Sequence, residues 1–167
     1  MCYIRYRRSE TVKNVLKFSV LTLGVIAMAG CGAKEDYTLK CTLEQNDVIN
    51  NYKTSSTYEI TTDGEIAKKV KTTEIITSEN EPFLDTVEEN LHETYNSMNE
   101  AYGGYTIDIT KEDGKITSVV EIDYTTLDIE SLLEDQPSMK SYANDKNQMT
   151  LEGIKGIYTA MGATCEE

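Results

Sequence analysis

The sequence predicts an α+β domain with a single antiparallel sheet, built from a three-strand meander and a hairpin, with the helices packed on one face. Five segments alternate apolar and polar residues, which is the period of a half-buried strand. Asp-Gly turns at residues 63–64 and 113–114 mark two of the connections. Between the two groups of strands, residues 82–102 have the period of a helix.

The meander comes first along the chain. The apolar faces of its first two strands are Tyr37, Leu39, Cys41 and Leu43, followed by Tyr52, Thr54, Ser56, Tyr58 and Ile60. The third strand is expected at residues 65–77, with Ile66, Val70 and Ile76 on one face. The TDGE turn at residues 62–65 joins the second strand to the third.

A long helix, a hairpin and one or two further helices follow. The stripe of the long helix is Leu84, Val87, Leu91, Tyr95, Met98 and Tyr102, and Gly103 ends it. The hairpin strands carry Tyr105, Ile107 and Ile109, then Ile116, Ser118, Val120, Ile122 and Tyr124. A short helix is expected at residues 128–135, and residues 138–148 are expected to be irregular. Thr150 caps a last helix whose expected face is Leu151, Ile154, Tyr158 and Met161.

The first thirty residues have the pattern of a bacterial export signal. Five basic residues and Glu10 give this segment a net charge of +4; the bases are Arg5, Arg7, Arg8, Lys13 and Lys17. Residues 18–33 then carry no charge, and this run of 16 is shorter than the roughly 18 residues of a membrane-spanning helix. We therefore expect residues 1–30 to be a lipoprotein signal peptide.

The signal ends in AMAGC, residues 27–31, which is similar to the lipobox of bacterial lipoproteins. Cys31 is therefore the expected lipidation site and the mature N-terminus. Residues 31–36 are the expected lipidated cysteine and tether, and residues 37–167 the α+β domain. The lipid would hold the chain on the extracytoplasmic face of the cell membrane. A plain secretory signal or an uncleaved anchor is the alternative, but neither explains a cysteine at this boundary.

Without residues 1–30, the chain has 137 residues, enough for one domain. Its 28 acidic residues and eleven lysines give a net charge of −17, and it contains no arginine. A surface this acidic repels nucleic acid and anionic headgroups, so nucleic acid is not an expected partner. The lipid on Cys31 would therefore be the contact with the membrane.

Two thiols remain after export, because Cys2 leaves with the signal and Cys31 carries the lipid. Cys41 lies on the apolar face of the first strand, and Cys165 follows the last helix, where the tail can fold back onto that strand. We expect a Cys41–Cys165 disulfide, with Cα atoms within about 7 Å. A pair of unlinked cysteines is the alternative.

Two runs of residues carry a resemblance to a known family. They are SVVEIDYTTLDIESLLED at residues 118–135 and TLEGIKGIYTAMGATCE at residues 150–166, in a chain whose tyrosine-rich hairpin precedes a long amphipathic helix. In pattern and element order, residues 31–167 resemble the YehR-like family of bacterial lipoproteins, whose domain has unknown function. The resemblance implies a small lipid-anchored α+β domain outside the cytoplasmic membrane and implies no reaction.

The sequence offers no catalytic or cofactor signature. His92 is the only histidine, which excludes HExxH and three-histidine zinc sites, and a Cys-His pair with Cys41 or Cys165 is disfavoured. Turn aspartates at 63, 113 and 145 lack the spacing of a calcium loop, so a solvated acidic face with at most weak calcium binding is expected. We predict no catalytic residue, no cofactor and no metal site.

Two functions stay open. The favoured one is a non-enzymatic lipoprotein that binds a protein or envelope-polymer partner through its sheet or its acidic face. The alternative is a small-ligand-binding lipoprotein with a tyrosine-lined pocket between sheet and helices. An exposed apolar or tyrosine patch would favour the first, and a tyrosine-lined pocket of about 300 Å³ or more would favour the second.

Overall fold

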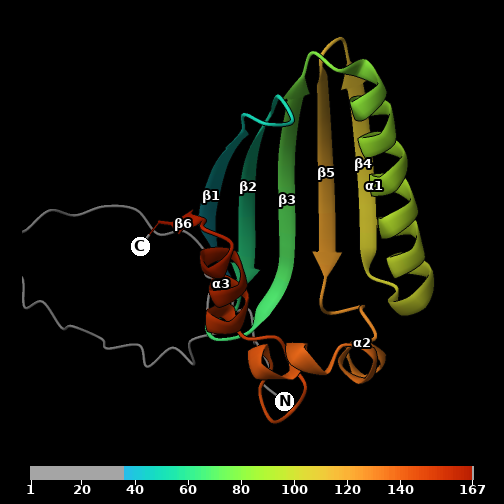
Figure 1. Ribbon diagram of the computed structural model, residues 1–167. Helices are drawn as coiled ribbons and strands as arrows, with labels where there is room; N and C mark the ends of the chain where they lie inside the picture. The colour runs from blue at the N-terminus through green and yellow to red at the C-terminus, as the bar shows by residue number, and fades with distance from the viewer. Residues whose placement is uncertain (1–35, 167) are drawn as a thin grey trace, which may run out of the picture. The chain divides into compact units, whose positions relative to one another are not determined.

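The computed structural model describes residues 36–166. Within them, six strands form one antiparallel sheet, accompanied by three α-helices and one 3-10 helix (Figure 1). The predicted α+β class and single antiparallel sheet are confirmed. The expected signal peptide, Cys31 and residues 31–35 of the tether lie outside the described residues.

The sheet joins a meander to a hairpin, as the sequence predicts. Its strands are β1 (Tyr37–Asp47), β2 (Tyr52–Thr62), β3 (Ala67–Ser78), β4 (Tyr105–Glu112), β5 (Lys115–Asp123) and β6 (Thr164–Cys165). Their order is β4-β5-β3-β2-β1-β6, so β3 pairs with β5 where the two groups meet. The two-residue β6 pairs with β1 at the edge of the sheet and is not among the predicted strands.

The helices begin and end at residues with clear local causes. They are α1 (Glu81–Tyr102), α2 (Ile129–Asp135), the 3-10 helix η1 (Pro137–Tyr142) and α3 (Leu151–Ala160). The side chain of Asn80 accepts a hydrogen bond from the N–H of Phe83 at the start of α1. Gly103, with φ +66°, follows the end of α1 and donates its N–H to the carbonyl of Asn99.

Helices α1 and α3 cover the same face of the sheet, which we call the inner face. Leu84 of α1 packs in a cluster with Ile76 and Ile116, whereas Ile154 of α3 packs in the cluster that contains Ile60 and Val70. Because cross-strand partners share a face, the pairings Ile60–Val70 and Thr54–Ile76 place both clusters on one side. In Figure 1, α1 runs alongside β4, and α3 lies over the meander, where it contacts β2.

Three local expectations are wrong. Ile66 lies outside β3 and forms an isolated bridge with Thr150, because the ladder shifts at Thr61 and Thr62. Met161 follows the end of α3 and is 53% exposed, so it does not belong to the buried face of the helix. Residues 138–148 are not wholly irregular, since η1 covers their first part.

The described residues carry their own core. All three hydrophobic clusters lie within residues 36–166, which belong to the unit Gly32–Glu167. This unit can therefore be studied as a chain that begins at residue 32. Among its described helices, none combines the length and apolar character that crossing a membrane requires.

Candidate functional site

An open cleft of about 630 Å³ lies at the end of the sheet where three connections meet. They are the β1–β2 loop, the β3–α1 junction and the β4–β5 turn. Three carboxylates line the cleft, from Glu79, Glu81 and Asp113, together with the ammonium group of Lys53. One aromatic residue, Tyr52, also lines it, and its ring stacks on Phe83 of α1 at 5.1 Å between centroids. The lining residues are thus mostly polar, and three of the ten are acidic.

Ser78 at the end of β3 ties the three connections together. Its hydroxyl donates to the carbonyl of Asn51 at 3.0 Å and accepts the N–H of Asn80 at 3.1 Å. Its own N–H donates to the carbonyl of Gly114 at 3.1 Å, and the Gly114 N–H donates to Glu81 Oε1 at 2.8 Å. The walls of the cleft are therefore held together by hydrogen bonds.

The β1–β2 loop presents two apolar side chains beside the cleft. Val48 is 80% exposed and Ile49 is 94% exposed. Asp47 fixes the loop, because its Oδ1 accepts the N–H groups of Ile49 and Asn50 at 3.0 and 2.9 Å. These contacts also lower the pKa of Asp47, mainly through the hydrogen bonds that Asn50 donates to its carboxylate. These two adjacent apolar side chains are therefore available to contact another molecule.

The sequence contains a weak signal for this site. Val48 and Ile49 are adjacent apolar residues between two strands, where turn residues are expected. The cleft itself has no such signal, because Ser78, Asn51 and Gly114 belong to three connections that only the sheet brings together.

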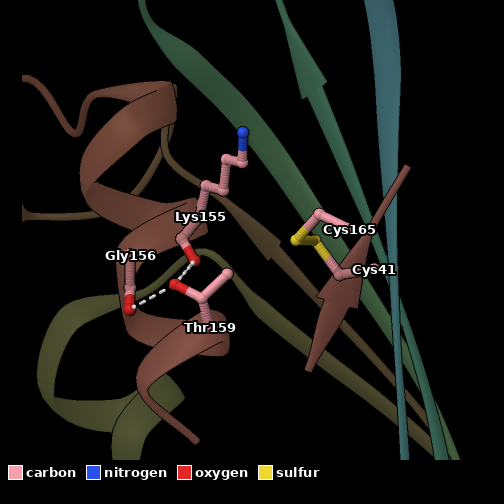
Figure 2. Close-up of a disulfide and its surroundings, with 5 residues drawn as sticks. All are labelled: Cys41, Lys155, Gly156, Thr159 and Cys165. Atoms are coloured by element: carbon pink, nitrogen blue, oxygen red, sulfur yellow. Dashed lines mark hydrogen bonds between the residues drawn. A yellow bond between two sulfur atoms is a disulfide. The ribbon is translucent and has the colours of Figure 1, made fainter. Parts of the chain in front are cut away.

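The two predicted disulfide residues meet at the edge of the sheet that β1 and β6 form. Cys41 and Cys165 are direct cross-strand partners on β1 and β6, and a disulfide joins them (Figure 2). Their Cα atoms are 3.9 Å apart, within the limit set from the sequence. The N–H of Glu166 extends the pairing by donating to the carbonyl of Lys40 at 2.9 Å. The tail thus lies beside the first strand.

Tyrosines gather on the inner face between α1 and α3. Tyr58 of β2 stacks on Tyr158 of α3 at 3.9 Å between ring centroids, and Tyr95 of α1 lies 6.3 Å from Tyr105 of β4. Burial raises the pKa of Tyr158 well above its usual range. These rings fill space against one another, and the 630 Å³ cleft has only Tyr52 among its lining tyrosines. The cleft is therefore not the expected tyrosine-lined pocket.

A polar row crosses the inner face beside these rings. Ser56 on β2, Glu74 on β3 and Ser118 on β5 are direct cross-strand partners. Both serines are 2% exposed, and the Ser56 hydroxyl donates to Glu74 Oε1 at 3.4 Å. The row separates the apolar cluster under α3 from the one under α1. The row is not among the features predicted from the sequence, although a glutamate at an inward position of a strand is a visible signal.

The remaining residues singled out from the sequence do not come together. His92 is exposed on α1, and Asp63, Asp113 and Asp145 lie in separate turns. Within residues 36–166, no three His, Cys, Asp or Glu side chains are grouped so that they could hold a metal ion. Cys31, the expected lipidation site, lies outside the described residues.

Comparisons with known proteins show the fold. No family model and no curated protein matches the chain. The structure is similar to the NMR structure of the Escherichia coli YehR protein, with a TM-score of 0.52 and 17% identity over 80% of this chain and 93% of that one. It is also similar to an NMR structure of a protein from Streptococcus pneumoniae TIGR4, with a TM-score of 0.46 and 13% identity over 96% and 99% of the two chains. The domain has a YehR-like fold, as the sequence resemblance implies, and at this identity the likeness concerns the fold alone.

Proposed function

We propose that this protein is a lipid-anchored binding domain of the cell envelope, without enzymatic activity, that contacts a protein or polymer partner at the cleft. The observation that carries the proposal is the cleft with its acidic lining and its two exposed apolar side chains, Val48 and Ile49. A mixed polar and apolar surface of this kind suits a macromolecular partner.

The position of the cleft fits a chain anchored at Cys31. Tyr37, the first residue of β1, comes six positions after Cys31, and six residue steps span at most about 20 Å. The 11 residues of β1 then run roughly 35 Å to the loop that holds Val48 and Ile49. An anchor on Cys31 would therefore leave the cleft at the end of the domain remote from the attachment.

Replacing Cys31 with serine tests the anchor. The wild-type protein should incorporate labelled fatty acid and remain with the membrane fraction, whereas the Cys31→Ser protein should incorporate none, because a serine hydroxyl cannot form the thioether. Incorporation is measured by gel fluorography of metabolically labelled cells. Cys41→Ser serves as the control and should leave labelling unchanged. Label in the Cys31→Ser protein would show that the anchor is assigned wrongly.

A photo-crosslinking side chain at Ile49 tests the contact site in intact cells. We expect discrete protein or polymer adducts from position 49 and none from Ser138, also an exposed residue, in η1 at the opposite end of the domain. The products are separated by gel and identified by mass spectrometry. Adducts to membrane lipid from position 49, or the same adducts from both positions, would contradict the proposed orientation and contact site.

A further inference from the structure

Strand β4 forms an edge of the sheet, and within residues 36–166 only β5 pairs with it. At the opposite edge, β6 and the Cys41–Cys165 disulfide cover part of β1. The β4–β5 register runs over all eight residues of β4 without a bulge, and β4 contains no proline. Bulges and prolines are among the usual devices that keep an exposed edge from pairing with another chain. β4 therefore lacks two of these devices.

The register shows which backbone groups of β4 face this free edge. The Asp123 N–H donates to the Gly104 carbonyl at 2.8 Å, so these two residues are a hydrogen-bonded pair. Such pairs alternate along an antiparallel ladder, so every second residue of β4 turns its backbone N–H and C=O away from β5. These residues are Tyr105, Ile107, Ile109 and Lys111. The Tyr105 N–H agrees with this assignment, because it donates to Asn99 Oδ1 of α1 at 3.1 Å.

The other free-edge groups have no protein partner within residues 36–166. The N–H and C=O groups of Ile107, Ile109 and Lys111 form no hydrogen bond with α1 or with any other described segment apart from the β4–β5 ladder. Helix α1 does not fill the position beside them, because it lies over the inner face, where Leu84 packs on residues of β3 and β5. An extended chain beside β4 would pair these groups with its own backbone.

The side chains beside the edge favour a cationic partner. Asp108 is exposed on the outer face near the middle of β4, and no ion pair among the described residues includes it. On the inner face, Lys111 bonds to Asp85, so this side of α1 flanks the edge. Glu88 lies about one turn further along the same side of the helix.

We propose that β4 binds an extended, basic segment of a partner protein as an additional antiparallel strand. The backbone of that segment would bond to the free groups of Ile107, Ile109 and Lys111. Directly opposite residues share a face, so alternate apolar side chains of the segment would lie beside the half-buried Ile107 and Ile109. Its lysine or arginine side chains would then lie on the outer face, next to Asp108. The inference uses the edge and not the cleft, so it does not rest on the function proposed above.

Other occupants of this edge fit less well. Two copies of this chain that paired through β4 would bring together two domains of net charge −17. An acidic peptide would be repelled by Asp108 and by the same net charge. A glycan has no row of backbone amides with the spacing of a strand, so it would leave most of the free-edge groups of β4 unpaired.

Hydrogen exchange followed by amide NMR of residues 32–167 tests the inference. The probe is a seven-residue peptide that alternates lysine and valine, begins and ends with lysine, and is blocked at both ends. At a peptide concentration of ten times its dissociation constant, the amides of residues 107, 109 and 111 should exchange about tenfold more slowly. The amides of residues 108 and 110 should change much less, because they already bond to β5. Equal changes at all five amides would contradict strand addition.

Two matched peptides separate backbone pairing from charge. The same peptide with N-methylated valines keeps every lysine but loses the N–H groups that would bond to β4, and it should bind about tenfold more weakly or worse. A peptide with glutamate in place of lysine should also bind at least about tenfold more weakly. Equal binding of the N-methylated peptide would reduce the interaction to a diffuse attraction to the acidic surface, and equal binding of the glutamate peptide would exclude a basic partner. Either result would overturn the proposal.

Two charge variants locate the contact. Asp108→Lys should weaken binding of the lysine peptide about fivefold, because it replaces an attraction across the new strand pair by a repulsion. Asp145→Lys changes the net charge equally at an exposed turn between η1 and α3 and should leave binding unchanged. Both side chains are exposed, so both variants should keep the wild-type amide spectrum. Equal weakening by the two variants, or a dimer of the domain alone that protects residues 107, 109 and 111, would overturn the proposal.

Discussion

Replacing both Cys41 and Cys165 with alanine should lower the free energy of unfolding of residues 32–167 by about 2–5 kcal/mol. The disulfide spans 124 residues of sequence, so it closes nearly the whole domain into a loop and removes many conformations from the unfolded chain. It also holds β6, a two-residue strand with little other pairing, against β1. Urea unfolding followed by circular dichroism measures the change.

Reduction of the wild-type protein separates the bond from the packing of its sulfur atoms. Cys41 is fully buried, so the alanine variant also loses some packing, whereas reduction leaves both sulfur atoms in the chain. A reductant should lower the stability of the wild type by most of the amount lost in the double variant and leave that variant unchanged. A double variant within about 1 kcal/mol of the oxidised wild type would show that the cross-link contributes little to stability.

Periodicity predicts the strands and helices of this domain because one face of each is buried. The buried residues of β2 recur at every second position, from Thr54 to Thr62, since only the inner face meets the helices. Asp-Gly turns fix the two tight hairpins, where Gly64 and Gly114 take positive φ. The long helix is predicted to within one residue at its start, because Asn80 and Pro82 are both helix-start residues.

The features that sequence did not predict depend on contacts between distant segments. η1 and the bridge of Ile66 to Thr150 form where the start of α3 meets the β2–β3 region, and no local pattern encodes that meeting. The cleft likewise depends on Ser78 bonding to two other connections. Glu74 differs from these, because its inward position on β3 follows from the same alternation that predicts Val70 and Ile76. The polar row at Glu74 was therefore within reach of the sequence.

The two glycines of α3 show how the structure changes an inference made from propensity. Each glycine in a helix costs about 1 kcal/mol relative to alanine, so propensity alone predicts a gain from either replacement. At Gly153, however, a Cβ atom would lie 2.7 Å from Tyr142 Cα, 2.8 Å from Thr150 Oγ1 and closer still to the Tyr142 carbonyl oxygen. That carbonyl accepts both the N–H and the hydroxyl of Thr150, at 3.0 Å each. The first turn of α3 therefore packs directly on the backbone of η1.

Gly153→Ala should accordingly lower the free energy of unfolding by about 2–4 kcal/mol, because the methyl group must displace backbone and disturb the Thr150 cap. Gly156→Ala is the matched control one turn later, where no heavy atom lies within 4 Å of the added Cβ. Its carbonyl, which accepts the Thr159 hydroxyl at 3.1 Å (Figure 2), is unchanged by the substitution. This variant should gain about 0.5–1 kcal/mol. Urea unfolding of both variants measures the two changes, and a gain in both would mean that α3 does not lie against Tyr142.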